Sequence, residues 1–286
     1  MVAATAAMGM SVPQLLANVT PDQICTSPYP HFSMQNVLPR DVYSALDREF
    51  PDLATVLNGR TSYGNNEAVR MSAKQVLADQ RISPLWRSFF EYHTSAEYWR
   101  NVIRLFGDFF RQEFPGLETR LGRRFEDWRV IPRGFSGEAE VRLDCQFVMN
   151  TPVTQVSSVK SPHVDLCDKI FSGLFYFRDP NDTTAGGDLQ MYAWQRSPRF
   201  IKHRTMNRDI KLAKTIHYAP NTYLCFVNSV KAIHGVSPRG ITAIPRRYIN
   251  FIAELPVEAF RPQQLNRWQR ILYRSELNAD TGEERY

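Results

Sequence analysis

The chain has 286 residues, and its hydrophobic content of 43% with 22% charged residues excludes a disordered chain and fits a folded globular protein. The formal net charge of +6 permits an anionic substrate or a nucleic acid but requires neither, because an excess of this size is most often a solvated surface. The four cysteines show no CxxC pairing, which argues against a zinc ribbon or a disulfide scaffold, so reduced thiols and a cytoplasmic location fit best.

The N-terminal stretch up to Val19 is small and apolar, but it lacks the basic start and the uninterrupted apolar run of a signal peptide. No stretch approaches the roughly 18 to 20 apolar residues that a membrane span needs, so we expect no membrane association. A short helix is predicted between Pro39 and Pro51, and the polar residues 52–82 read as loops.

A strongly helical region begins at Ser83 or Pro84, and Ser95 is a good N-cap for its second helix. Apolar side chains recur there at helical spacing, namely Leu85, Phe89, Phe90, Tyr98, Val102, Leu105, Phe109 and Phe110. These aromatic residues are most simply core residues that pack on a sheet. The sequence therefore predicts a helical layer against a β-structure.

From Trp128 onward the pattern changes to that of β-strands. Residues 138–150 alternate apolar and polar side chains, which places a polar row including Arg142 and Gln146 on one face. Further strands are predicted for 170–177, after the Gly-rich turn at Gly186, and after Pro220. The intervening segment 195–214 is strongly basic; it could clamp an anionic group of a substrate, although a solvated loop is the default interpretation.

The most informative motif is His163-Val164-Asp165. Residues two apart on a β-strand point to the same face, so the imidazole and the carboxylate would lie together. His234 is the candidate third ligand, because a site of two histidines and one carboxylate leaves positions open on Fe(II) for substrate chemistry. One HxD pattern alone is weak evidence, and the order of the neighbouring motifs strengthens it.

The run RRYINFIAEL near the end of the β-region places an arginine among apolar residues. Arg247, Ile249 and Phe251 share one face by the period of two, and we expect that face to point into the barrel. A guanidinium there needs an anionic partner. Arg246 competes for this role, but it shares its face with the more polar residues of the run, which we interpret as the outer side.

From about Arg129 to Leu255 the sequence resembles the prolyl-hydroxylase-like branch of the Fe(II)- and 2-oxoglutarate-dependent oxygenases. Four motifs in order along the chain carry the resemblance: His163 with Asp165, the turn Gly186-Gly187-Asp188-Leu189, His234 followed by Val236 and Pro238, and Arg247. The resemblance covers less than half of the chain.

The resemblance implies a mainly β fold with a helical layer (α+β), built on a double-stranded β-helix (jelly-roll, cupin-like) core with N-terminal helices packed on one face. We expect a single domain over 1–286. Its parts would be a supporting helical and loop region (1–127), the jelly-roll catalytic core (128–256), and a C-terminal helix with a tail (257–286). That last helix is predicted from Pro262 to Leu272.

The resemblance also implies the site residues. His163, Asp165 and His234 would hold Fe(II) as the catalytic centre, and Arg247 with Tyr176 would anchor the far carboxylate of the co-substrate 2-oxoglutarate. O2 would be the other co-substrate. Gln146 is a weaker candidate for a co-substrate contact.

We therefore expect a dioxygenase that hydroxylates a small molecule, such as an amino acid, a sugar or a natural-product intermediate, with succinate and CO2 as co-products. The net charge allows an anionic substrate. Alternatives are a prolyl-type hydroxylase of protein side chains and, in another class, a non-catalytic jelly-roll binding protein. Nucleic acid is a poor partner, because the related demethylases carry an arginine six residues after the co-substrate arginine, where this chain has Ala253.

Overall fold

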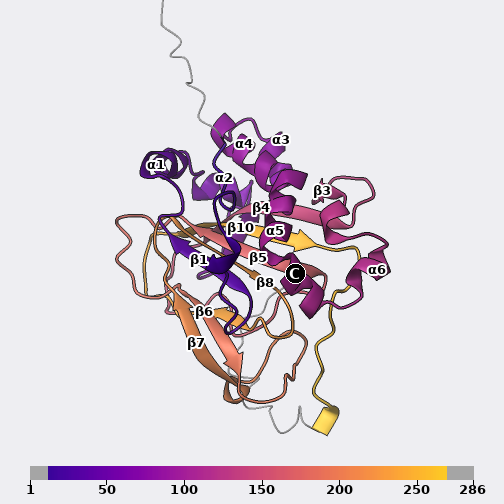
Figure 1. The fold of residues 1–286 in the computed structure, drawn as a ribbon. Coiled ribbons are helices and arrows are strands. Elements are labelled where there is room, and N and C mark those ends of the chain that lie inside the picture. Colours follow the sequence, from indigo (N-terminus) through magenta and orange to yellow (C-terminus); the bar gives the residue numbers. More distant parts are fainter. Residues whose placement is uncertain (1–11, 269–286) are drawn as a thin grey trace, which may run out of the picture.

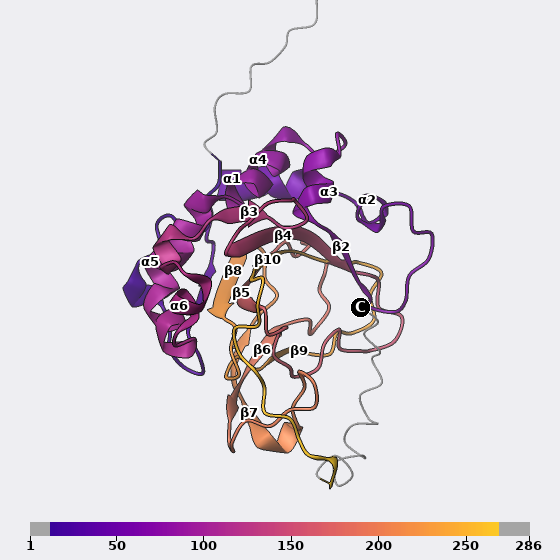
Figure 2. The ribbon, with the colours of Figure 1, turned by 90° about the vertical axis from the view of Figure 1, so that its right-hand side faces the viewer.

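The computed structural model describes residues 12–268, and its strands form two sheets that face each other (Figures 1 and 2). The larger sheet has seven strands, which are β1 (His31–Gln35), β2 (Ala68–Met71), β3 (Val130–Pro132), β4 (Val141–Asn150), β5 (Lys169–Tyr176), β8 (Thr222–Val227) and β10 (Arg246–Glu254). The smaller sheet consists of β6 (Leu189–Trp194), β7 (Ile210–Ile216) and β9 (His234–Val236).

The path of the chain between the sheets defines the fold. The larger sheet has the order β1-β8-β5-β10-β4-β2, with β3 paired to β4, and the smaller has the order β7-β6-β9. After β5 the chain crosses to β6 and β7, returns to β8, crosses again to β9 and returns to β10. Residues 153–163 extend the smaller sheet through single bridges to 234–242. This alternation is the jelly-roll, or double-stranded β-helix, topology that the motifs indicated.

The helices are gathered on the outer side of the larger sheet, away from β6, β7 and β9 (Figure 2). In the described part of the chain these are α1 (Arg40–Arg48), α2 (Leu53–Leu57), α3 (Ala73–Ala78), α4 (Pro84–His93), α5 (Ala96–Glu113) and α6 (Leu117–Leu121). There are also single 3₁₀ turns η1 (Pro21–Gln23), η2 (Phe125–Asp127) and η3 (Asn207–Asp209), of which η3 leads directly into β7 of the smaller sheet. None of these helices is both long and apolar enough to cross a bilayer.

The helix starts follow the predicted capping residues. The Ser83 hydroxyl accepts the Trp86 N–H at the start of α4, and the Ser95 hydroxyl accepts the Tyr98 N–H at the start of α5. Each cap satisfies one of the N–H groups that a helix terminus leaves without an intrahelical partner. The predicted short helix before Pro51 is also confirmed as α1.

Aromatic side chains join the helical layer to the sheet. Phe147 of β4 lies 4.7 Å from Trp86 and 4.7 Å from Phe90 of α4, measured between ring centroids, and all three side chains are fully buried. Such contacts between large rings contribute both buried area and favourable edge-to-face geometry. The predicted helical layer against a β-structure is thus confirmed.

The predicted C-terminal helix does not begin at Pro262; within the described residues the helical positions start at Arg267. Pro262 to Asn266 are not helical; instead Gln264 forms a parallel bridge with Phe200, whose carbonyl accepts the N–H of Leu265 at 2.8 Å. Pairing with a neighbouring segment satisfies these backbone groups and so overrides the local preference that Pro262 indicated. Residues 1–11 and the tail after Trp268, including Leu272, lie outside the described residues.

Candidate metal and co-substrate site

The three predicted metal ligands lie together between the sheets. His163 and His234 form an antiparallel bridge in which each N–H donates to the other's carbonyl at 2.9 Å, so their rings lie side by side with centroids 4.3 Å apart. Asp165 follows two residues after His163, and its Oδ1 is 3.6 Å from His163 Nε2 and 3.9 Å from His234 Nε2. Strand pairing brings together residues that are 71 positions apart in the chain.

Backbone contacts fix which ring nitrogens face Asp165. Nδ1 of His163 is 2.7 Å from the Ser161 carbonyl, and Nδ1 of His234 is 2.9 Å from the Ala232 carbonyl. A carbonyl can only accept, so each Nδ1 carries the proton and each neutral ring directs the lone pair of Nε2 toward the carboxylate. His163 Nε2 is buried and has no hydrogen-bond partner among the described residues. This arrangement is the one by which proteins orient metal-binding histidines.

Asp165 is held by its other oxygen. The Ser172 hydroxyl on β5 donates to Oδ2 at 2.6 Å, whereas Oδ1 faces the two imidazoles and also lies 3.8 Å from Nζ of Lys160. Burial by itself raises the pKa of the Asp165 carboxyl, but the nearby positive charges of Lys160 and Lys169 oppose burial, and the pKa lies well below its usual range. Burial lowers the pKa of both His163 and His234. The site therefore offers one anionic and two neutral ligands.

This donor set fits a divalent metal ion. The ligand atoms of the three residues all lie within 4.8 Å of one another. Neighbouring ligands at about 2.1 Å from one ion would be separated by roughly 3 Å, so a small closure of the three side chains suffices. Two imidazoles and one carboxylate on a single face are the ligands of non-haem Fe(II) oxygenases.

A buried arginine lies between the same two sheets. Arg246, 2% exposed, begins β10; its Nε donates to the Gly187 carbonyl at 2.9 Å and its Nη1 to Asn150 Oδ1 at 3.2 Å. Arg246 forms no ion pair with a carboxylate in the described part of the chain, and its Nη2 has no hydrogen-bond partner there. A buried guanidinium without a counter-charge is costly, so this end of the barrel favours an anionic ligand.

Three tyrosine rings enclose this guanidinium. Its central carbon lies 4.9, 4.9 and 4.6 Å from the ring centroids of Tyr176, Tyr218 and Tyr248, respectively. The Tyr176 hydroxyl is buried without a partner among the described residues, and burial raises its pKa, so it remains a neutral donor. Tyr176 thus lies against Arg246 and offers a buried hydroxyl on the same side of the sheet.

The expectation that Arg247 points into the barrel is wrong. Its Nη2 pairs with Asp47 Oδ1 of α1 at 2.9 Å, and its guanidinium lies 5.2 Å from the ring centroid of Phe50. Ile249 and Phe251 do share its face, as predicted, but that face is covered by helices and is not the barrel interior. The grouping of Arg247 with Ile249 and Phe251 on one face was correct, but that face points to the helices and not into the barrel. Arg246, on the opposite face, is therefore the inward arginine.

Gln146 faces the space between the sheets, but its side chain forms hydrogen bonds with residues other than Arg246. Its amide donates to Asp144 at 2.7 Å and its carbonyl oxygen accepts from Asn250 at 3.2 Å. Asn250 is four positions from Arg246 on β10 and pairs directly with Gln146. The side-chain hydrogen bonds of Gln146 are therefore made to protein.

Part of the basic segment 195–214 lies beside the candidate metal ligands. The Val164 N–H donates to the His203 carbonyl at 2.9 Å, and His163 bridges to Arg204. A hollow of about 460 Å³ adjoins these loops and is lined by Cys167, Lys202, His203, Glu258, Arg261, Pro262 and Gln264. Part of the segment that the sequence analysis considered for binding an anionic group therefore lies next to the triad.

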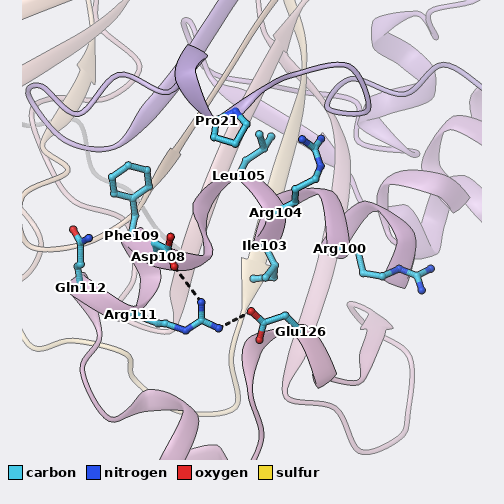
Figure 3. Close-up of a pocket in the computed structure, with 10 residues that line it drawn as sticks. All are labelled: Pro21, Arg100, Ile103, Arg104, Leu105, Asp108, Phe109, Arg111, Gln112 and Glu126. Carbon is cyan, nitrogen blue, oxygen red and sulfur yellow. Dashed lines mark hydrogen bonds and ion pairs between the residues drawn. The ribbon is translucent and has the colours of Figure 1, made fainter.

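A larger groove, about 610 Å³, belongs to another part of the molecule (Figure 3). It follows the outer side of α5, where Arg111 pairs with Asp108 and Glu126, and it also borders Pro21. None of its lining residues belongs to the metal triad or to the tyrosine enclosure. It does not contribute to the candidate site.

Three residues of the site were not singled out from the sequence. Ser172 orients Asp165, Asn150 accepts from Arg246, and Gly187 offers its carbonyl to the same guanidinium. Gly187 was noticed only as part of a turn. The alternation within residues 138–150 could have placed Asn150 on the face of Gln146, had that row been assigned to the barrel interior.

No protein-family model and no curated protein matches the chain. Among solved structures it is similar to a prolyl-4-hydroxylase from Pseudomonas putida, with 15% identity, a TM-score of 0.48, and coverage of 85% of this chain and 100% of that one. It is also similar to a prolyl 4-hydroxylase from Phytophthora capsici, with 12% identity, a TM-score of 0.46, and coverage of 87% of this chain and 68% of that one. A third similar structure is a prolyl hydroxylase from Trichoplax adhaerens in complex with a hypoxia inducible factor peptide fragment. It has 11% identity and a TM-score of 0.37, and the match covers 78% of this chain and 83% of that one.

The identities are 15% or lower and the TM-scores are below 0.5. For this reason we base the function on the geometry of the site itself.

Proposed function

We propose that this protein is an Fe(II)- and 2-oxoglutarate-dependent oxygenase. The observation that carries the proposal is Arg246, a buried guanidinium without a carboxylate partner in the described residues, which lies between the same sheets as a His-Asp-His triad. The triad alone would also suit other divalent metals. The unpaired arginine adds the need for an anion, and 2-oxoglutarate is an anion that also chelates iron.

His163, Asp165 and His234 would hold the iron. The carbonyls of Ser161 and Ala232 fix the two rings with Nε2 inward, and the other triad contacts hold the carboxylate in place. Bound Fe(II) and 2-oxoglutarate supply the chemistry that converts 2-oxoglutarate and O2 to succinate and CO2 while one oxygen atom enters a C–H bond of the substrate. The protein contributes the fixed orientation of three ligands on one side, which leaves the other side open.

Arg246 and Tyr176 would bind the far carboxylate of 2-oxoglutarate. Arg246 offers Nη2 and Tyr176 offers a neutral hydroxyl, and both atoms are buried without a partner in the described residues. Gly187 and Asn150 hold the guanidinium in position through its other two nitrogens. The surrounding tyrosine rings keep water away, which strengthens a charge-assisted hydrogen bond.

For the primary substrate we propose a small molecule. The hollow of about 460 Å³ beside His203 supports this, because pockets of about 300 to 1,000 Å³ are typical of small-ligand sites. Lys202 and Arg261 in its lining suit an anionic group. A hydroxylase of proline in proteins, or a binding protein without turnover, are the competing outcomes.

Succinate formation under air, with Fe(II), 2-oxoglutarate and a substrate panel, tests the proposal. The panel contains amino acids, sugars, small organic acids and proline-containing peptides, and Asp165→Ala serves as the inactive control. Stimulation by a small molecule supports the whole proposal, and stimulation by peptides alone supports the oxygenase with a protein substrate. No succinate above the Asp165→Ala level, with or without substrate, contradicts the oxygenase assignment.

A further inference from the structure

A second arginine is buried at the same end of the barrel as Arg246. Arg239 is 1% exposed and follows Pro238, in the segment that continues β9; its N–H donates to the Ser157 carbonyl at 2.9 Å. Both arginines pack against Gly187: a Cβ added there would lie 3.2 Å from Cδ of Arg246 and 3.5 Å from Cδ of Arg239. The absence of a side chain at Gly187 thus lets the two arginine side chains approach the same point.

Arg239 has protein partners for only one of its three nitrogens. Nη2 donates to Asp182 Oδ2 at 2.7 Å and to the Ile244 carbonyl at 2.9 Å. Its Nε and Nη1 are buried and have no hydrogen-bond partner among the described residues. Asp182 is shared, because it also lies 3.7 Å from Arg178 and accepts the N–H of Thr184. Within the described residues, no second carboxylate pairs with these arginines.

We propose that Arg239 binds the far carboxylate of 2-oxoglutarate together with Arg246, an inference that rests on the proposed function. A carboxylate has two oxygens with about four acceptor positions. Among the described residues, the buried donors without partners at this end of the barrel are Nη2 of Arg246, the Tyr176 hydroxyl, Nε and Nη1 of Arg239, and Nδ2 of Asn150, whose oxygen accepts from Arg246. One carboxylate thus offers enough acceptor positions to pair with both arginines and the tyrosine. Without it, each stays buried and unpaired, which is unfavourable.

The two arginines hold the co-substrate from different strands. Arg246 begins β10, whereas Arg239 follows the β9 segment that also carries the metal ligand His234. The protein thus selects a dicarboxylate over a 2-oxo acid with an uncharged tail. A residue that only supports the fold would affect both kinds of acid equally, so this selectivity is the informative measurement.

The test is anaerobic calorimetric binding of 2-oxoglutarate and of 2-oxopentanoate, which lacks the far carboxylate, to the Fe(II)-loaded protein. We expect Arg239→Gln to weaken 2-oxoglutarate binding about tenfold or more, as for a lost hydrogen bond to a charged group, and to change 2-oxopentanoate binding less than about twofold. Arg246→Gln should show the same selective loss. Arg247→Gln, on the helix-covered face, should bind both acids as the wild type does.

Asp182 would be left buried and unpaired in Arg239→Gln, so the double variant Arg239→Gln/Asp182→Asn is measured as well. It removes both charges, and we expect the same selective loss of 2-oxoglutarate binding. Equal weakening of both acids in these variants, or wild-type affinity for 2-oxoglutarate, overturns the role of Arg239. If Arg246→Gln retains its selective effect in that case, the proposed function stands. Failure of the wild type to prefer 2-oxoglutarate over 2-oxopentanoate overturns both.

Discussion

The two faces of strand β10 lie in different environments. Arg247, Ile249 and Phe251 face the helices, where the arginine has a carboxylate partner and the apolar side chains join the aromatic core. Arg246 and Tyr248 face the smaller sheet, where the arginine has none in the described residues. Adjacent arginines in one strand therefore have opposite electrostatic environments.

Both sides of the sheet bury polar atoms without a partner among the described residues, but on the helix-covered side, which holds Arg247 Nε and His93 Nε2, apolar packing dominates. Burying polar atoms without partners is unfavourable, and native proteins rarely do so without a reason. On the inner face Nε2 of His163, the Tyr176 hydroxyl and Nη2 of Arg246 all lack partners among the described residues. A metal ion and an anion bound on the inner face would supply these three atoms with partners.

The largest expected effect is on the triad itself. We expect His163→Ala, Asp165→Ala and His234→Ala each to abolish retention of Fe(II) after desalting, because each leaves only two ligands. His203→Ala is the matched control, since His203 lies beside the triad but is not one of its ligands. Metal analysis of the desalted proteins is the measurement. Wild-type iron content in any of the three variants removes that residue from the site.

The two adjacent arginines provide the next test. Arg246→Gln should weaken 2-oxoglutarate binding by about 2 to 5 kcal/mol, or at least about 30-fold, because a desolvated carboxylate loses its charged partner. Arg247→Gln should leave that affinity unchanged and cost about 1 kcal/mol or less of unfolding free energy, because its ion pair with Asp47 is partly exposed. Binding and denaturation curves measure both quantities. A larger binding defect in Arg247→Gln would reverse the assignment of the two faces.

On the helix-covered face, Phe147→Ala should cost about 3 to 5 kcal/mol of unfolding free energy, because it leaves a cavity beside Trp86 and Phe90. Phe135→Ala, at a side chain that is 41% exposed, should cost under about 1 kcal/mol. Urea denaturation gives both values. A marginal effect of Phe147→Ala would mean that the aromatic layer does not stabilise the sheet.

A smaller effect is expected at the support of the metal carboxylate. Ser172→Ala removes the hydroxyl that donates to Asp165 and should lower Fe(II) affinity about 10- to 100-fold without unfolding the protein. Ser33→Ala, whose hydroxyl contacts Lys214 elsewhere on the same sheet, is the control. Competition with a metal chelator measures the affinities. Equal affinity in the two variants would show that Asp165 needs no such support.

The smallest effect is a pH dependence on the helix-covered face. Burial lowers the pKa of His93 to about 3, and its Nδ1 donates to the Phe89 carbonyl. Between the unfolded value of about 6.5 and the folded value, the unfolded state binds more protons, so stability falls as the pH is lowered through that window. The wild type should lose about 2 kcal/mol more than His93→Leu between pH 6.5 and 5. Denaturation at both pH values measures this, and parallel losses would contradict it.

The triad could be predicted from the sequence because its ligands sit in short motifs whose order is informative. The helix at Ser95 could be predicted for the same reason, since capping and periodicity are local signals. The local sequence does not determine which arginine of β10 faces the helices and which faces the smaller sheet. An apolar strand face can meet a helical layer or a barrel interior, and only the tertiary arrangement decides between them.

The reversal at Arg247 also shows which signal was misjudged. We assigned the most apolar face of β10 to the barrel interior, yet a separate aromatic helical layer was already predicted and needed an apolar surface of its own. Arg239 was missed for a related reason: its importance lies in the two nitrogens that have no partner in the described residues, and a sequence shows no unpaired atoms. The predicted start of the C-terminal helix at Pro262 was wrong because Gln264 forms a β-bridge with Phe200 instead.

The most direct test of the inner face as a metal and co-substrate site is an anaerobic titration of the protein with 2-oxoglutarate, with and without Fe(II), followed by visible absorption. We expect the weak metal-to-ligand band to develop only when both are present, to saturate, and to be absent in Asp165→Ala. Binding of each should also raise the affinity for the other by the same factor. No band in the wild type, or equal affinity for 2-oxoglutarate with and without iron, would contradict the shared site.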